Sequence, residues 1–357
     1  MKVTFILPFS GRNPVGGFRV VYEYANHLVQ RGHNVTVVHP AGLYLGVQKN
    51  DRLWRNILKY IVFGLTGNYL PQKWFQLDSR VRCIWAPSLK YWFVPKAEVV
   101  VATAWETAEW VGTYPDNRGR KYYLLQHLED WAVERERLLR TWKLPLRKIV
   151  IAQWLLELAS EIGEEARYIP NGLDFETFGL DVPPESRQSS KVLMLHHELN
   201  WKGTEDGVAA LTLVKESRPE LEATLFGVKR PETGQLPNWI TFVENPSRRA
   251  LRNLYNQAAV FVAPSWGEGW GLTACEAMQC GCALAMTAVN GHTEFGVDGV
   301  NTLMSPAHNP ELLAKNILRL LTDSDLRLQL SRHGVETMCQ FSWEQSTDAI
   351  EQYFQQG

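Results

Sequence analysis

The chain has 357 residues, of which 45% are hydrophobic, so it can bury large cores and its length suggests two domains. Its 37 Lys and Arg residues nearly cancel its 38 Asp and Glu residues, and the formal net charge of -1 excludes a global field that would attract nucleic acid. The longest apolar runs are far too short to span a bilayer, and we expect no signal peptide in the opening MKVTFILPFSG. We therefore expect a cytoplasmic protein, and five cysteines without zinc spacing agree with a reducing compartment.

Apolar runs alternate with helical segments along the N-terminal half. KVTFILPF at 2–9 predicts a buried strand, and a loop with Gly16 and Gly17 leads into a helix that closes at Gly32. The apolar face of that helix comprises Val20, Val21, Tyr24, Ala25, Leu28 and Val29. Further strands are predicted at 33–40, 97–104, 121–127 and 147–153. Strands that alternate with helices predict a parallel sheet joined by right-handed crossovers.

The stretch between residues 49 and 96 mixes positive charge with aromatic side chains. It holds nine Lys or Arg residues, two Asp residues and ten aromatic residues. Such a mixture suits an anionic membrane surface or a glycan, because aromatic rings sit among lipid headgroups and stack on sugar faces. DRLWRNILKYIVFGL at 51–65 predicts an amphipathic helix on that surface. The alternative is an ordinary insertion that packs its aromatic residues into the core of the N-terminal domain.

A segment rich in Pro, Gly and Ser at 170–190 has no sustained periodicity and predicts a linker that acts as a hinge. A second alternating series follows it. Its predicted strands lie at 191–197, 222–228, 239–245, 260–265 and 282–289, with helices at 204–216, 248–257 and 272–281. We therefore predict an α/β fold with parallel-sheet domains at 1–170 and 171–340, and a C-terminal helix at 341–357 that packs back towards the first domain.

Two carboxylates flank a glycine-rich turn in PSWGEGWGLTACEAMQCGC, which spans 264–282. The turn follows a predicted strand and opens a helix, so backbone N–H groups at the helix start can receive an anion. Because the chain reverses at the turn, we expect Glu268 and Glu276 to point the same way. The alternatives are a capping box formed by Thr273 and Glu276, and a solvated loop acid at Glu268.

Neither cysteine nor aspartate spacing predicts a metal site. Cys280 and Cys282 are interpreted as core packing. Asp323 and Asp325 match an Asp-x-Asp metal pattern, but they lie between two predicted C-terminal helices and are interpreted as a helix cap. We expect no bound metal.

The glycine-rich stretch resembles the signature of retaining, nucleotide-sugar-dependent glycosyltransferases with the GT-B fold, family 4 (group 1), in which two Glu are separated by seven residues. RYIPNGLD, NWKG, NGHTEFGVDGVNTLMSP and FSWEQSTDAIEQYF resemble other segments of the family in order and spacing, from Ile149 to the C-terminus. PVGGFRVVYEYANHLVQRGHNVTVV matches more loosely. The resemblance implies two Rossmann-like domains, an N-terminal one for the acceptor and a C-terminal one for the donor.

The resemblance also implies roles for residues of the C-terminal half. Glu276 binds the ribose hydroxyls of the donor, Glu268 faces the transferred sugar, and Lys202 neutralises the diphosphate. Donor contacts through backbone groups are implied for Gly269, Trp270, Gly271 and Leu272, and for the base near Val243 and Asn245. The alternative for Lys202 is that it has no role in binding and is an exposed lysine at a helix start.

Two histidines stand at positions where the family has residues that contact the donor. His197 stands where the family usually has an Arg on the diphosphate, so phosphate binding is expected to be weaker or dependent on pH. His127 stands where the family has a His facing the transferred sugar. Gly16 and Gly17 do not form G-x-G-x-x-G, and their loop is expected to approach the donor diphosphate or the acceptor. A purely structural role is the alternative for either histidine.

The resemblance implies transfer of a sugar, with retention and without metal or cofactor, from a nucleotide-diphosphate sugar to a glycan, lipid-linked or other hydroxyl acceptor. The leaving phosphate accepts the acceptor's proton, and the pathway is expected to be polysaccharide or glycolipid synthesis. Peripheral association with the inner face of the membrane is a further hypothesis. The alternatives are a GT-B nucleotide-sugar epimerase, a phosphorylase, for which no pyridoxal-phosphate lysine is identified, and a non-catalytic glycan-binding scaffold.

Overall fold

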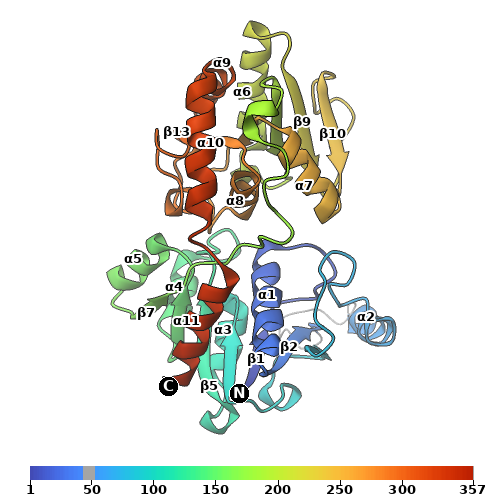
Figure 1. The fold of residues 1–357 in the computed structure, drawn as a ribbon. Helices are drawn as coiled ribbons and strands as arrows, with labels where there is room; N and C mark the ends of the chain where they lie inside the picture. The colour runs from blue at the N-terminus through green and yellow to red at the C-terminus, as the bar shows by residue number, and fades with distance from the viewer. Residues whose placement is uncertain (43–52, 357) are drawn as a thin grey trace. The chain divides into compact units, whose positions relative to one another are not determined.

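A computed structural model describes residues 1–42 and 53–356 of the chain. The chain divides into two compact units: unit 1 comprises Met1–Asn171 and Trp343–Gly357, and unit 2 comprises Gly172–Ser342 (Figure 1). The sequence prediction had put these borders at 170/171 and 340/341. Each unit contains one parallel β-sheet with helices, so the predicted α/β class with two Rossmann-like domains is confirmed.

Unit 1 is built on a seven-stranded parallel sheet with the order β3-β2-β1-β4-β5-β6-β7. The strands are β1 (Lys2–Ile6), β2 (Asn34–Pro40), β3 (Arg82–Ala86), β4 (Val99–Ala102), β5 (Arg120–Leu125), β6 (Arg147–Val150) and β7 (Ala166–Tyr168). β1 pairs with β2 on one side and with β4 on the other, so the strand order reverses beside it. In open parallel sheets a ligand crevice opens at such a switch point, at the carboxyl ends of the strands.

The helices of unit 1 are α1 (Gly16–Gln30), α2 (Leu53–Thr66), α3 (Trp105–Gly112), α4 (Arg135–Trp142), α5 (Gln153–Glu161) and α11 (Trp343–Gln355). All six residues predicted for the apolar face of α1 are buried, which confirms that face. α11 packs on α1, where His33 contacts Glu351 at 2.9 Å and the Trp343 ring stacks on His27. Residues 51 and 52 of the predicted amphipathic helix lie outside the described residues. No helix within 1–42 and 53–356 has the length and apolar character needed to cross a bilayer.

Unit 2 is built on a six-stranded parallel sheet with the order β10-β9-β8-β11-β12-β13. The strands are β8 (Lys191–Leu195), β9 (Glu222–Gly227), β10 (Ile240–Glu244), β11 (Val260–Ala263), β12 (Ala283–Thr287) and β13 (Leu303–Ser305). The helices are α6 (Thr204–Ser217), α7 (Arg248–Gln257), α8 (Leu272–Gln279), α9 (Pro310–Thr322) and α10 (Ser324–Met338). β8 lies between β9 and β11, so the switch point of this sheet lies at the carboxyl ends of β8 and β11.

Two minor predictions in unit 2 are confirmed. Asp323 is the N-cap of α10, and its carboxylate accepts the backbone N–H of Leu326 at 3.0 Å. The thiols of Cys280 and Cys282 are free and buried, as expected for core packing.

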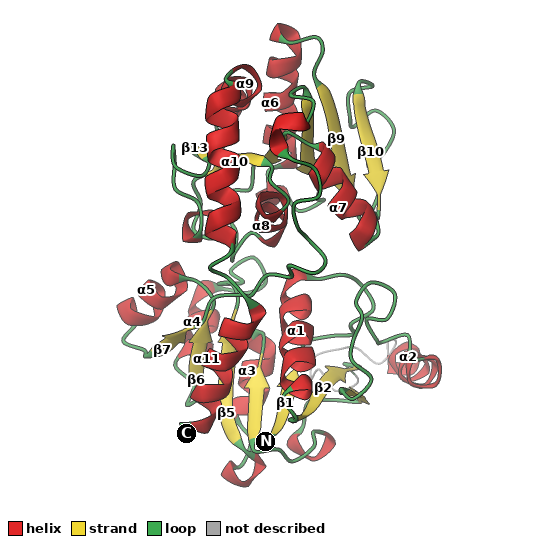
Figure 2. Ribbon diagram, viewed as in Figure 1, coloured by secondary structure: helices red, strands yellow, loops and turns green. Residues whose placement is uncertain are grey.

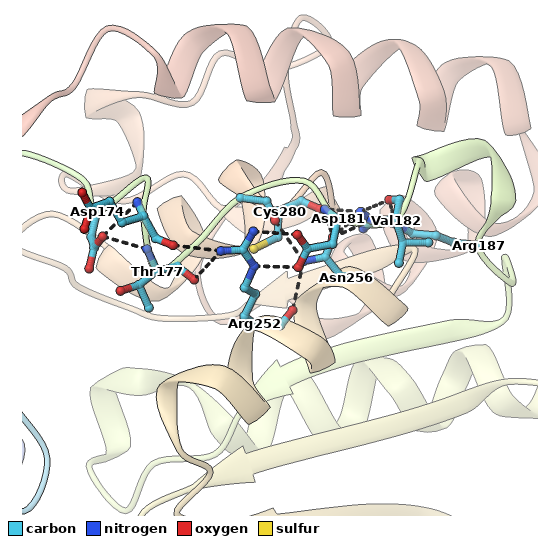
Figure 3. Close-up of polar contacts among 10 residues, drawn as sticks. Asp174, Thr177, Asp181, Val182, Arg187, Arg252, Asn256 and Cys280 are labelled. Atoms are coloured by element: carbon cyan, nitrogen blue, oxygen red, sulfur yellow. Dashed lines mark hydrogen bonds and ion pairs between the residues drawn. The ribbon is translucent and has the colours of Figure 1, made fainter.

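The segment predicted as a linker is instead bonded to unit 2 along much of its length, and we call residues 172–190 the strap (Figure 3). Arg252 of α7 forms two hydrogen bonds of 2.6 Å with the Asp181 carboxylate and donates to the carbonyls of Glu176 and Thr177. The side-chain oxygen of Asn256 accepts the N–H groups of Asp181 and Val182. The prediction of a linker is therefore wrong for residues 172–190, which belong to unit 2, because side chains of α7 satisfy the backbone groups that regular structure would otherwise pair. The border between the units, at 171/172, lies at the start of the predicted segment.

A buried cation completes the strap. The Arg187 side chain donates to carbonyl oxygens of Val182, Tyr255, Ala258 and Cys280, and only 8% of the residue is exposed. Burial lowers the pKa of this guanidinium, with smaller opposing effects from the neighbouring thiols. The strap is thereby joined to the carboxyl end of α7 and to the chain just after α8.

We expect Arg252→Ala to loosen the strap. The variant loses four hydrogen bonds and should lower the free energy of unfolding of unit 2 by about 1–2 kcal/mol. Hydrogen exchange at the amides of Asp181 and Val182 measures the local effect, which should be faster exchange. Arg249→Ala, an exposed neighbour on the same helix, is the matched control. Equal protection of the two amides in both variants would show that Arg252 does not hold the strap.

Candidate functional site

The turn between β11 and α8 lies against the segment that follows β8. The backbone N–H of Trp266 donates to the carbonyl of Trp201 at 2.7 Å. Gly203 adopts a left-handed conformation with φ of 63°, and a Cβ atom there would lie 2.0 Å from the carbonyl oxygen of Pro264. Only glycine allows this approach, which places Lys202 beside the turn that carries Glu268.

Lys202 and Glu268 form an ion pair at this place. The Lys202 Nζ lies 2.7 Å from Glu268 Oε1, and the Ser265 hydroxyl donates to the same oxygen at 2.8 Å. The two side chains are 23% and 12% exposed, so the pair is mostly shielded from water. Burial raises the pKa of Glu268, but Lys202, His292 and the hydrogen bonds oppose it and the net pKa lies below its ordinary value. Glu268 is therefore an anion at neutral pH.

His292 lies under the same turn and was missed by the sequence analysis. Its Nδ1–H donates to the carbonyl of Thr287 at 2.8 Å, which leaves Nε2 as the acceptor of the neutral ring. Burial lowers the pKa of His292, and only 1% of the residue is exposed, so the ring is neutral at physiological pH. A Cβ atom at Gly291 would lie 2.6 Å from the carbonyl oxygen of Glu268, so this glycine is needed for the close contact.

These side chains line a small cavity that is partly open to solvent. Lys202, Ser265, Glu268, Thr273 and His292 contribute its polar lining, and Leu195 with residues of β11 contributes the apolar lining. Lys202 and Glu268, two residues for which the resemblance implied separate roles, are thus brought together in one cavity at the carboxyl ends of β8 and β11. A cation, an anion and a neutral imidazole there can bind an anionic ligand and stabilise a neighbouring positive charge.

Glu276 is not among the residues that line this cavity. It is 4% exposed, and its Oε2 accepts the hydroxyl of Tyr255 at 3.2 Å. The capping-box alternative is wrong, because the N-cap of α8 is Gly271 with φ of 100°, and Thr273 lies inside the first turn of the helix. Tyr255, which positions the carboxylate, was also missed by the sequence analysis.

The start of α8 presents backbone rather than side chains. The cap residue Gly271 has no side chain that could accept a hydrogen bond from the first turn, and its carbonyl accepts the N–H groups of Ala274 and Cys275. Trp270 is 3% exposed and its ring packs edge-to-face against Phe341, so the indole is a core group. Gly269, Trp270 and Gly271 are buried and Leu272 is half-buried, and none of these four predicted residues is among those that line the cavity.

His197 directly follows His196 beyond β8. Its Nδ1 accepts the backbone N–H of Leu199 at 3.1 Å, and the Thr204 hydroxyl contacts both its N–H and its carbonyl. Burial lowers the pKa of His197, and the nearby Lys202 lowers it further. The ring is therefore neutral at pH 7, carries its proton on Nε2, and offers one hydrogen bond but no charge.

Val243 and Asn245 lie at the carboxyl end of β10, two strands from β8 in the sheet. Asn245 is exposed and has φ of 43°, and its N–H donates to the carbonyl of Gly227 at 2.6 Å. Both residues share the carboxyl edge of the sheet with Lys202 and Glu268, but they do not line the same cavity.

The predicted residues of unit 1 also come together. α1 begins at Gly16, and the side-chain N–H of Gln126 donates to the carbonyl of Gly17 at 3.1 Å. His127 follows Gln126, and its Nδ1 accepts the N–H of Leu128 at 2.8 Å, so the proton of a neutral ring lies on Nε2. Gly16, Gly17 and His127 thus share the carboxyl edge of the sheet of unit 1.

The loop that carries His127 is held by an acidic residue that the sequence analysis did not single out. Glu129 has φ of 47°, and its carboxylate accepts the N–H of Trp105 at the start of α3, at 3.0 Å. Burial raises the pKa of Glu129 to about 7, with a smaller contribution from Glu106. The ring of His127 also meets Trp131 and Trp154 edge-to-face. No spacing rule pointed to Glu129, since its partner is 24 residues away.

No group of three or more His, Cys, Asp or Glu side chains within 1–42 and 53–356 is placed to hold a metal ion.

Comparison with known proteins gives a family match within unit 2. Residues 191–323 match the family model described as glycosyl transferases group 1. An uncharacterized glycosyltransferase of Methanocaldococcus jannaschii is 29% identical over 131 residues, which are 36% of this chain and 37% of that protein. A D-inositol 3-phosphate glycosyltransferase of Salinispora arenicola is 33% identical over 100 residues, 28% of this chain and 22% of that protein. The chain therefore matches well under half the length of these relatives.

The fold extends beyond these local matches. The crystal structure of HepE from Anabaena in complex with UDP-glucose aligns with 100% of this chain and 100% of its own, with a TM-score of 0.76 and 16% identity. The likeness confirms the GT-B fold for the chain as a whole. The predicted resemblance to group 1 glycosyltransferases is confirmed by the family model.

We expect Lys202→Met to destabilise unit 2 by about 2 kcal/mol at neutral pH, because it leaves a shielded carboxylate without its ammonium partner. The folded-state pKa of Glu268 lies below the ordinary 4.5, so the pair contributes stability that is complete above 4.5 and is lost as the pH falls through the depressed pKa. The variant should therefore lose less stability on acidification than the wild type. Urea unfolding followed by hydrogen exchange in β8 and β11 measures both effects.

Lys229→Met is the matched control for this prediction. Lys229 pairs with Glu198 at a similar distance of 2.8 Å, but both side chains are more than 60% exposed, so water screens the pair. The control should leave the stability of unit 2 nearly unchanged. Equal effects of the two substitutions would contradict the stabilising role of the Lys202–Glu268 pair.

Proposed function

We propose that this chain, which has the GT-B fold, belongs to the group 1 glycosyltransferases and transfers a sugar from a nucleotide-diphosphate sugar to a hydroxyl group with retention of configuration and without a metal ion. The observation that carries the proposal is the Lys202–Glu268 ion pair in a cavity at the start of α8. An ammonium group and a helix start attract a diphosphate, and a carboxylate stabilises positive charge at the anomeric carbon.

The donor diphosphate competes with Glu268 for Lys202 in this proposal. When it binds, the ammonium group neutralises the leaving group and the carboxylate turns to the sugar. Backbone N–H groups at the start of α8 support the phosphate side, and His197 adds one neutral hydrogen bond through Nε2. Since the HepE structure contains UDP-glucose, UDP-sugars are the first donors to test.

The nucleoside is assigned to Glu276 and to the end of β10. Glu276 is proposed to accept the ribose hydroxyls, with Tyr255 fixing the carboxylate by its 3.2 Å hydrogen bond. The base lies near Val243 and Asn245 in this proposal, at the carboxyl edge of the sheet, where Val243 is half-buried and Asn245 is exposed.

Transfer breaks the bond between the anomeric carbon and the phosphate oxygen and forms one from the same face to the acceptor oxygen. The acceptor proton goes to the departing phosphate, so no protein base is needed. His127 of unit 1 donates through Nε2 to a hydroxyl of the transferred sugar, and the loop before α1, with Gly16 and Gly17, contacts the diphosphate or the acceptor. The acceptor is proposed to be a glycan or a lipid-linked saccharide, in polysaccharide or glycolipid synthesis.

A non-catalytic glycan-binding scaffold is the second candidate. It is favoured by His197, which is neutral and engaged by Leu199 where the family usually has a charged Arg. The two candidates differ in turnover, since a scaffold releases no nucleotide from any donor.

Glu268→Gln keeps the shape of the side chain but removes its charge. We expect nucleotide release from the accepted donor to fall by about a hundredfold or more, with a smaller change in KM, because the charge acts mainly in the transition state. Release of UDP, GDP or dTDP from the matching donor sugars provides the measurement. Glu198→Gln, which removes an exposed carboxylate near the same segment, should retain full activity. Undiminished turnover in Glu268→Gln would reject its catalytic role.

Tyr255→Phe removes the hydroxyl that positions Glu276. We expect binding of the ribonucleotide to weaken about threefold to tenfold, while binding of the corresponding 2′,3′-dideoxynucleotide changes little, because the dideoxy form lacks the hydroxyls that Glu276 accepts. Calorimetric titrations of both nucleotides provide the measurement. Tyr24→Phe, a buried tyrosine of unit 1, controls for loss of a core hydroxyl. An equal loss for both nucleotides would indicate a general packing defect instead.

A further inference from the structure

α2 carries an apolar stripe on its solvent side. The stripe consists of Leu58, Ile61, Val62 and Leu65, which are 63%, 48%, 40% and 84% exposed. Their spacing of three, four and seven residues places them on one face of the helix, within an arc of roughly 100°. Figure 2 shows α2 at the outer edge of unit 1, beyond β2.

The opposite face of α2 holds the helix in this orientation. Tyr60 and Phe63 stack on the ring of Trp85 in β3, and the Trp85 indole N–H donates to the carbonyl of Tyr60 at 3.0 Å. On a helical wheel these residues lie about 180° from the centre of the stripe. The stripe is therefore directed outward by packing, whereas an ordinary surface helix turns its apolar stripe to the core.

Cations lie beside α2: Lys59 borders the Val62 edge of the stripe, and Arg12 lies near Phe63 on the opposite face. Lys59 is exposed, and its ammonium lies 5.3 Å from the centre of the Phe63 ring; the guanidinium of Arg12 lies 6.0 Å from the same ring. Lys73 is exposed beside Trp74, whose indole donates to the carbonyl of Gly11. The sequence contains no Asp or Glu from Leu53 to Phe75. This side of unit 1 therefore combines the apolar stripe of α2 with positive charge.

We propose that the α2 stripe inserts into the interface of an anionic phospholipid bilayer, with Lys59 at the level of the lipid phosphates. A helix of 14 residues is about 21 Å long, shorter than the roughly 30 Å apolar core of a bilayer, so α2 lies along the surface. Insertion buries the four exposed side chains, and the phosphates balance the charge of Lys59.

The inference deepens the proposed acceptor class, because docking on the bilayer brings unit 1 to lipid-linked saccharides. It does not depend on sugar transfer, since lipid binding is measured without donor or acceptor. Self-association of two copies through the stripe is the competing use of such a face, and charge decides between them: two like-charged stripes repel each other, whereas anionic lipid attracts both.

Flotation of the full-length protein with vesicles tests the proposal. Wild type should bind vesicles of phosphatidylcholine with phosphatidylglycerol, bind vesicles of phosphatidylcholine alone much more weakly, and lose binding as salt increases. Leu58→Ser with Leu65→Ser should weaken binding at least about tenfold without affecting folding, because both side chains are exposed. Lys59→Glu should weaken binding to the anionic vesicles while leaving the stripe intact.

Val228→Ser with Val297→Ser is the matched control. These unit 2 side chains are 62% and 55% exposed, so the pair removes a similar kind of surface elsewhere, and vesicle binding should equal that of the wild type. Absence of wild-type binding, or equal binding by the Leu58 and Leu65 variant, would overturn the proposal. Light scattering that shows a dimer in wild type and a monomer in that variant would overturn it in favour of self-association. Donor turnover measured in the same samples reports separately on the proposed function.

Discussion

An ammonium group and a carboxylate held 2.7 Å apart at the carboxyl edge of one sheet are the interaction on which the proposed function of this protein depends. Three glycines make the contact possible. Gly203 brings Lys202 against the turn, Gly271 opens the helix behind it, and Gly291 lets the loop with His292 pack beneath it. A Cβ atom at any of the three would lie within 3 Å of a neighbouring atom. The charged pair thus rests on backbone geometry that only the smallest residue permits.

The same edge is connected to the strap through α7. Arg187 of the strap bonds to the carbonyl of Tyr255, and the hydroxyl of Tyr255 bonds to Glu276. A segment whose composition predicted mobility is therefore part of the rigid support of a buried carboxylate. Two histidines at comparable edges, His197 in unit 2 and His127 in unit 1, accept backbone N–H groups at Nδ1 and so carry the proton of the neutral ring on Nε2. Both are arranged to donate a single hydrogen bond.

The local signals in the sequence were sufficient for ten of the strands, for the buried face of α1 and for the Asp323 cap, but they missed β3, β7 and β13. The features that were predicted depend on periodicity, on capping chemistry or on motifs that remain close in the chain. His292, Tyr255, Gln126 and Glu129 were missed because each acts through a contact that only folding creates; Gln126, for example, meets Gly17 across 109 residues. The prediction for the strap was wrong for the same reason, since the side chains that bond to its backbone lie on α7, which is distant in the sequence. The outward direction of the α2 stripe also depends on a distant residue, Trp85.

Hydrogen exchange of the wild-type protein with and without a saturating nucleoside diphosphate tests the central claim most directly. If the Lys202–Glu268 pair opens to receive a diphosphate at the start of α8, amide exchange should slow at Gly269 to Leu272 and beside Lys202, and the best of UDP, GDP and dTDP should give the largest effect. Unchanged exchange at these amides with all three nucleotides, or protection confined to other segments, would contradict the account.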